Sequence, residues 1–171
     1  LGIMVANLSA HKRGWDDEWE FYSNWGEKGV KLQKILIDLV DEDTNAFNSI
    51  IKAFSLPKDT AENLKIRDTE IQKATKNAID VPFKIMRVCL ESCDLLLAMA
   101  KKGNPNSISD VGVGMYCIHA AVHGAYLNVR INSKELKDKK IVKKVDIECK
   151  KIIEKINSKL IDIQSLVDKK L

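Results

Sequence analysis

The stretch LQKILIDLVDEDTNAFNSIIKAF, residues 32–54, decides the fold, because its apolar residues recur at spacings of three and four. This spacing is typical of one buried face of a long α-helix. The apolar positions are Leu32, Ile35, Leu36, Leu39, Val40, Phe47, Ile50, Ile51 and Phe54. Continuing the count past Val40 predicts a buried position at Asp43. Since a buried carboxylate must be paired, hydrogen-bonded or protonated, Asp43 is a candidate functional residue.

Helical periodicity continues on both sides of this stretch, and strand-like alternation is absent. We expect a first helix that ends near 12–14 and further helices at about 16–54, 61–102, 107–132 and 133–171. The fifth has one apolar seam, formed by Ile141, Val145, Cys149, Ile152, Ile156, Leu160, Ile163 and Val167. The sequence therefore predicts an all-α fold, a bundle of about five long, mostly antiparallel helices that forms one domain over residues 1–171.

Several residues are expected to shape these helices. Gly26 and Gly29 should bend or weaken the early part of the second helix. Thr60 or Asp59 is the expected N-cap of the third helix. Pro82 lies inside the third helix and should kink or split it, because proline cannot donate the helical hydrogen bond.

Composition and charge describe an ordinary soluble protein, with 45% hydrophobic and 30% charged residues and a net charge of +4. The Lys-rich stretch 137–151 is interpreted mainly as a solvated helix face, with attraction of an anionic substrate as a secondary role. No basic stripe is interleaved with aromatic residues, so we expect no nucleic-acid partner. The longest apolar run, 95–100, is too short to cross a bilayer, so we expect no membrane association.

Cysteine and histidine residues give little support for a metal site. Cys89 and Cys93 lie one helical turn apart on an apolar face, where thiols usually act as small hydrophobic groups. Reduced thiols favour a cytoplasmic location. His119 and His123 could form a two-ligand site, but partly buried polar side chains are the favoured interpretation, and we predict no metal.

The fourth helix has a strip of small and polar residues on one face. Its members are Asp110, Gly114, Cys117, Ala121, Gly124 and Asn128, with Asn132 one turn further on. Small residues allow a second backbone or a flat ligand to approach closely. Asp110 has either a functional role or a structural one in the first helical turn, where the macrodipole favours a carboxylate. The amides of Asn128 and Asn132 are suited to hold a polar ligand or a neighbouring backbone.

A series of short motifs occurs in a specific order along the chain. They are residues 39–47 (LVDEDTNAF), 56–58 (LPK), 81–83 (VPF), 103–104 (GN), 109–110 (SD) and 124–132 (GAYLNVRIN). Together, from Met4 to the last helix, the chain resembles the cyclodeaminase domain of the formiminotransferase-cyclodeaminase family. Family members carry a Pro-Gly-Gly-Gly-Ser stretch before the first helix, and this glycine-rich segment is absent from residues 1–171.

The resemblance implies roles for particular residues. The second Asp of the family's Leu-Val-Asp-x-Asp motif is its proposed catalytic residue and matches Asp43. Lys58 and Arg67 match family positions. They either bind the substrate's glutamyl carboxylates through charge-assisted hydrogen bonds or are exposed surface cations. With Asp110, Asn128 and Asn132, they form the predicted substrate-binding set. The family's helical bundle dimerises and binds folate near the dimer interface.

The implied reaction converts 5-formimidoyltetrahydrofolate to 5,10-methenyltetrahydrofolate and ammonia, in histidine degradation and one-carbon metabolism. The resemblance implies no cofactor beyond the tetrahydrofolate substrate. This substrate can carry one glutamate or a polyglutamate tail. It implies a homodimer or higher oligomer, and leaves open whether a formiminotransferase domain lies in the same or a separate chain. Two alternatives remain: a methenyltetrahydrofolate cyclohydrolase, which ammonia release would distinguish, and a non-catalytic helical interaction module in which Asp43 forms a buried ion pair.

Overall fold

The computed structural model describes residues 1–12 and 16–171, and all of the regular structure in them is helical. The α-helices are α1 (Gly2–Ala10), α2 (Trp19–Phe54), α3 (Ala61–Lys102), α4 (Ile108–Ser133) and α5 (Lys139–Asp168), with short 3₁₀ turns η1 (Asp16–Glu18) and η2 (Pro105–Ser107). The all-α prediction is confirmed. The predicted end of the first helix extends to Arg13 and Gly14, which lie outside the described residues; α1 itself ends at Ala10.

Local chemistry accounts for the helix ends. Thr60 is the N-cap of α3, and its hydroxyl accepts a hydrogen bond from the Asn63 N–H at 3.1 Å, as predicted. The fifth helix begins later than expected, at Lys139. The reason is Asp138, whose carboxylate accepts hydrogen bonds from the Lys140 and Ile141 N–H groups and so caps α5.

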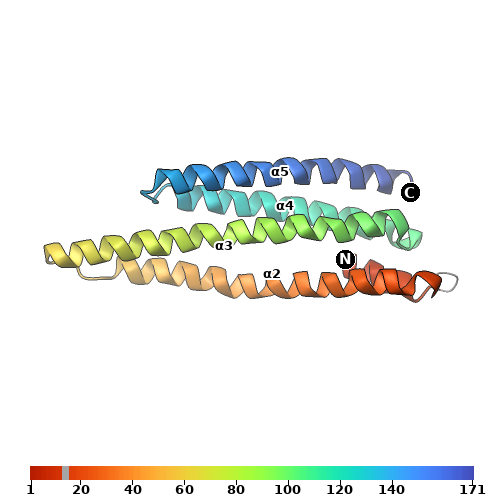
Figure 1. Ribbon diagram of the computed structural model, residues 1–171, viewed down its shortest axis with the longest axis horizontal. Helices are drawn as coiled ribbons and strands as arrows, with labels where there is room; N and C mark the ends of the chain where they lie inside the picture. Colours follow the sequence, from red (N-terminus) through yellow and green to blue (C-terminus); the bar gives the residue numbers. More distant parts are fainter. Residues whose placement is uncertain (13–15) are drawn as a thin grey trace.

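Helix α3 is the centre of the bundle. It packs against α2 on one side and against α4 and α5 on the other, while the short α1 covers the start of α2 (Figure 1). The far ends of α2 and α3 extend beyond the α4–α5 turn as a two-helix arm (Figure 1). This arm has neighbours on fewer sides than the rest of the bundle.

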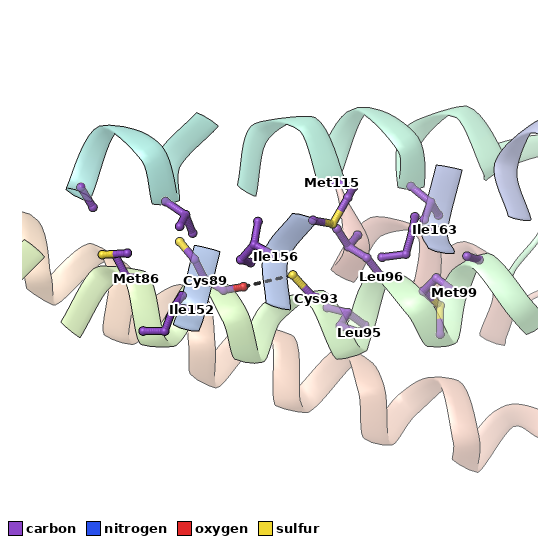
Figure 2. Close-up of a cluster of buried hydrophobic side chains, with 14 of the residues drawn as sticks. Met86, Cys89, Cys93, Leu95, Leu96, Met99, Met115, Ile152, Ile156 and Ile163 are labelled. Carbon is purple, nitrogen blue, oxygen red and sulfur yellow. Dashed lines mark hydrogen bonds between the residues drawn. The ribbon is translucent and has the colours of Figure 1, made fainter. Parts of the chain in front are cut away.

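The main core lies between α3, α4 and α5 (Figure 2). It includes fully buried Met86, Met99, Met115, Ile156 and Ile163. The predicted α5 seam is confirmed, since Val145, Cys149, Ile152, Ile156, Ile163 and Val167 are buried and Ile141 and Leu160 are half-buried. A second, smaller cluster joins α2 to α3 through Leu32, Leu39, Ala46, Ala78, Val81 and Val88.

The glycines of α2 allow α1 to approach closely. A Cβ atom added at Gly29 would lie 2.6 Å from Cγ1 of Ile3, and one at Gly26 would lie 3.2 Å from the Asn7 side chain. Helix α2 is continuous through both positions. Neither glycine interrupts α2, and close packing against α1 favours glycine at these positions.

Helix α3 is also continuous through Pro82, so of the two predicted outcomes, a kink or a split, the split does not occur. A proline cannot donate to the carbonyl four residues earlier, which here belongs to Ala78. The Asn132 side-chain amide on α4 donates to this Ala78 oxygen at 2.7 Å. The carbonyl that Pro82 leaves without a helical donor is therefore satisfied by α4.

Replacing Asn132 by alanine should lower the free energy of unfolding by about 1 kcal/mol, because the Ala78 carbonyl loses its donor. In a Pro82→Ala background, Asn132→Ala should lower the free energy of unfolding by clearly less. The reason is that the N–H of residue 82 can then donate to the Ala78 carbonyl. A double-mutant cycle in urea measures the difference. Equal costs in the two backgrounds would show that Asn132 does not act through this carbonyl.

The four cysteines are free thiols in two different environments. Burial raises the pKa of Cys89 to about 11, of Cys93 to about 12 and of Cys149 to about 11. The Cys93 thiol also donates to the Cys89 carbonyl at 3.5 Å (Figure 2). Cys117 is exposed. Because the thiolate is the reactive form, the three buried thiols should be inert in the folded protein.

We therefore expect a thiol-specific disulfide reagent to modify Cys117 in the folded monomer and the other three thiols only after unfolding. A Cys117→Ser variant is the control, and it should give no rapid reaction under native conditions. Rapid reaction of a thiol in that variant would contradict the buried placement of Cys89, Cys93 and Cys149.

Candidate functional site

Helix α2 buries a narrower face than its sequence predicts. Its fully buried side chains beyond the contact with α1 recur every seven residues, at Leu32, Leu39, Ala46 and Ala53. Leu36 and Ile50 are half-buried, whereas Ile35, Val40, Phe47, Ile51 and Phe54 are exposed. The prediction of one wide buried face is wrong for these five residues. The physical reason is that, among the described residues, α3 is the main neighbour of α2 over this stretch, and a pair of helices buries only a narrow seam.

Asp43 lies at the edge of this seam. It is seven residues from half-buried Leu36 and from half-buried Ile50, and it is exposed. Within the described part of the chain, its carboxylate makes no hydrogen bond or ion pair, whereas the adjacent Glu42 pairs with Lys84 at 2.7 Å. The prediction that Asp43 faces the core of the single chain is therefore wrong. Its carboxylate is instead presented on the surface without a partner.

A second set of apolar residues on α2 faces away from the core. We call it the outer stripe of α2, formed by Val30, Ile37, Val40, Phe47, Ile51 and Phe54, all at least half exposed. These residues recur at spacings of three, four and seven, as expected for a helix face that packs on another helix. A continuous apolar surface of this kind is rare on a soluble monomer and usually marks an interaction site.

Helix α4 also has an exposed face with small and apolar side chains. Of the strip predicted from the sequence, Gly114 is buried and Asp110 is half-buried, whereas the remaining members are exposed: Cys117, Ala121, Gly124 and Asn128. Val113, Leu127 and Ile131 extend this open face of α4. A Cβ atom added at Gly124 would meet nothing within 4 Å, so this part of the helix has space in front of it.

An apolar groove connects the two exposed faces. It has a volume of about 460 Å³ and is lined by residues of α1, α2, α3 and α4, among them Ile3, Leu36, Val40, Leu96, Cys117 and Ile118. Val40 lies one helical turn before Asp43, and Cys117 lies one turn before Ala121. The groove therefore leads to Asp43 on one side and to the open face of α4 on the other.

The structure does not bring Lys58 and Arg67 to Asp43. Both are near the tip of the two-helix arm, where Lys58 is exposed in the loop after α2. Arg67 donates two hydrogen bonds to the Phe54 carbonyl, at 3.3 and 3.2 Å, and its guanidinium lies over the Phe54 ring. Phe54 is eleven residues beyond Asp43 on the same helix, roughly 16 Å along its axis. Arg67 thus stabilises the end of α2.

A group of cations that sequence reasoning did not assign to the site lies at the α4–α5 turn. A cavity of about 720 Å³, here called the basic basin, is lined by Arg130 of α4 and its C-cap Lys134, by Lys139 and Lys143 of α5, and by Asn128. The Lys-rich stretch 137–151 was the available signal. It could not show the basin, because two of the four cations come from α4 and only the turn brings them together.

The histidine pair has the environment predicted for partly buried polar groups. The rings of His119 and His123 are 4.4 Å apart, and Nε2 of His119 lies 3.1 Å from the Asn157 side-chain oxygen. Residues 1–12 and 16–171 contain no cluster of three or more His, Cys, Asp or Glu side chains suited to a metal ion. No helix in the same residues is long and apolar enough to span a membrane.

Comparisons with known proteins agree on one family. The family model described as formiminotransferase-cyclodeaminase matches residues 1–151. A methenyltetrahydrofolate cyclohydrolase of Methylorubrum extorquens is 38% identical over 139 residues, which cover 81% of this chain and 67% of that protein. A formimidoyltransferase-cyclodeaminase of Gallus gallus is 34% identical over 140 residues, but the match spans only 26% of its length.

The fold agrees as well. The crystal structure of a formiminotetrahydrofolate cyclodeaminase from Thermotoga maritima superposes with a TM-score of 0.77 at 27% sequence identity. The match covers 99% of this chain and 79% of that one. Because the family model matches residues 1–151 of the 171 residues, the chain belongs to the formiminotransferase-cyclodeaminase family.

Proposed function

We propose that this chain is a folate-dependent enzyme of one-carbon metabolism that closes 5-formimidoyltetrahydrofolate to 5,10-methenyltetrahydrofolate and releases ammonia. The single observation that carries this proposal is the position of Asp43. Its carboxylate is unpartnered within the described chain and lies one turn beyond Val40 of the apolar groove, at the position that the resemblance matches to the family's proposed catalytic residue. The groove has the apolar character that suits a flat aromatic ligand.

The reaction needs one group that accepts and then donates a proton. N10 of the folate attacks the formimidoyl carbon and forms a C–N bond, and the N10 proton must leave. The bond from that carbon to the terminal nitrogen then breaks. That nitrogen departs as ammonia with the N10 proton and one further proton from solvent, so the product carries one positive charge. Asp43 would serve as general base in the first step and general acid in the second.

A second copy of the chain would complete this site. We propose an isologous dimer in which the outer stripe of α2 and the open face of α4 pack on their equivalents. Covering these faces removes apolar surface from water and also excludes water from the surroundings of Asp43. A carboxylate in such a place is suited to proton transfer. The location that we propose for such an enzyme is the cytoplasm.

A cyclohydrolase is the second candidate, favoured by the 38% identity to the Methylorubrum extorquens protein. In that reaction water attacks the methenyl carbon, and the resulting adduct opens to 10-formyltetrahydrofolate. Asp43 would take a proton from the attacking water. The same groove and the same carboxylate would serve both reactions, so the substrate distinguishes them.

The test offers each folate separately to the purified protein. Ammonia release from 5-formimidoyltetrahydrofolate, with growth of the near-ultraviolet absorbance of the methenyl product, is the expected result. Enzyme-dependent loss of that absorbance from 5,10-methenyltetrahydrofolate, without ammonia release from the first substrate, would favour the cyclohydrolase. Folate binding without turnover of either compound would overturn the proposal and leave a non-catalytic module.

A further inference from the structure

The basic basin between α4 and α5 has an excess of positive charge that the chain itself does not neutralise. Four cations line it, together with one carboxylate, Asp146. That carboxylate is already engaged, because Lys150 pairs with it at 2.7 Å and the Tyr126 hydroxyl donates to it at 2.7 Å. The side chains of Lys134 and Lys143 make no hydrogen bond or ion pair with any described residue.

Helix stabilisation explains only part of this charge. The Lys139 ammonium donates to the Leu136 carbonyl at 2.8 Å and to the Lys134 carbonyl at 3.4 Å, so it satisfies the end of α4. Arg130 lies over the Tyr126 ring, 5.7 Å from its centroid. Lys134 and Lys143 have no comparable structural task, and like charges that share one cavity repel each other.

The walls of the basin are not uniformly polar. Leu127, Val129, Ile131 and Val142 also line it, and Leu127 and Ile131 are 62% and 59% exposed. Asn128 belongs both to the basin and to the open face of α4, so the basin adjoins the proposed site. A ligand that fits the basin has an apolar or aromatic body for its apolar walls, an amide for Asn128 and carboxylates for its cations.

We propose that the basic basin binds the p-aminobenzoyl-glutamate end of the folate, with Lys134 and Lys143 as the main carboxylate partners. This inference rests on the proposed function for the identity of the substrate. It replaces Lys58 and Arg67 in that role, since both lie near the tip of the two-helix arm and Arg67 is also held by the Phe54 carbonyl. Arg130 and Asn128 complete the cavity beside the two lysines.

The test uses p-aminobenzoyl-L-glutamate as probe and the Lys134→Gln/Lys143→Gln variant. Neutralising two cations that make no hydrogen bond or ion pair with any described residue should leave the helical circular dichroism unchanged. The dissociation constant of the probe, measured by calorimetry, should rise about tenfold or more. In wild type, affinity should fall as salt is added, because exposed charges are screened. p-Aminobenzamide, which lacks the glutamate, should bind no better to wild type than to the variant.

Lys155→Gln is the matched control, because Lys155 is an exposed lysine of the same helix outside the basin. It should leave probe affinity unchanged. In the enzyme assay the double variant should raise KM about tenfold and leave kcat unchanged. Equal affinities in wild type and the double variant, equal losses in the control, or no binding of the probe to wild type would each overturn the inference. Since probe binding requires no turnover, an inactive protein that binds the probe would contradict the proposed function alone.

Discussion

Replacing Asp43 by asparagine should lower turnover of 5-formimidoyltetrahydrofolate by about two orders of magnitude or more. Asparagine preserves the size and polarity of the side chain but cannot transfer protons. Because Asp43 is exposed and unpartnered in the described chain, the change removes no contact that stabilises the monomer. Ammonia release measures the effect, and circular dichroism and folate binding should remain close to those of the wild type.

Asp41→Asn is the matched control for this experiment. Asp41 is also an exposed carboxylate, two residues away and therefore on a different side of α2. Its replacement should leave turnover unchanged. Near-normal turnover of the Asp43 variant would remove Asp43 from the chemistry, and a similar loss in both variants would point to the charge of the helix rather than to one proton-transferring group.

Placing a charge in the outer stripe of α2 should abolish the proposed dimer. Phe47 is 61% exposed in the single chain, so Phe47→Glu should not affect folding of the monomer. In the dimer it would bury an unpaired carboxylate, which is strongly unfavourable. We expect a folded monomer in sedimentation velocity at low micromolar concentration, and loss of activity, because Asp43 would no longer be covered.

Ile161→Glu tests whether this effect belongs to the outer stripe. Ile161 is 70% exposed on α5 and belongs neither to the outer stripe of α2 nor to the open face of α4. The control should remain dimeric and active, and dilution of the wild type should reduce activity and folate binding together. A wild-type protein that is monomeric and fully active at the same concentration would overturn the proposed dimer.

Local and periodic features of the sequence predicted most of the fold. The break before Thr60, the bounds of α3 and the seam of α5 follow from capping chemistry and from regular apolar spacing. These signals are reliable because they depend on neighbours in the chain. For α5, the seam also faces one continuous core, so periodicity and burial coincide.

The same reasoning was wrong where burial depends on how many helices surround an element. Periodicity shows that Val40, Phe47 and Ile51 belong to helix-packing faces, but it does not show whether the neighbour lies in the same chain. The position of Asp43 was identified by a burial argument that the single chain contradicts, and its functional assignment rests on the family motif. The basic basin could not be predicted from the sequence, because its cations come together only through the α4–α5 turn.

The bond between Asn132 and the Ala78 carbonyl has a consequence for the order in which the protein is made. The donor follows its acceptor by 54 residues. During synthesis from the N-terminus, α3 therefore emerges with an unsatisfied carbonyl at its middle, and a lone helix tends to break at a proline. Until α4 docks, only water can satisfy this carbonyl, so α3 gains the Asn132 hydrogen bond only after most of α4 has been synthesised. The central helix of the bundle thus depends for one of its own hydrogen bonds on a helix that follows it in the chain.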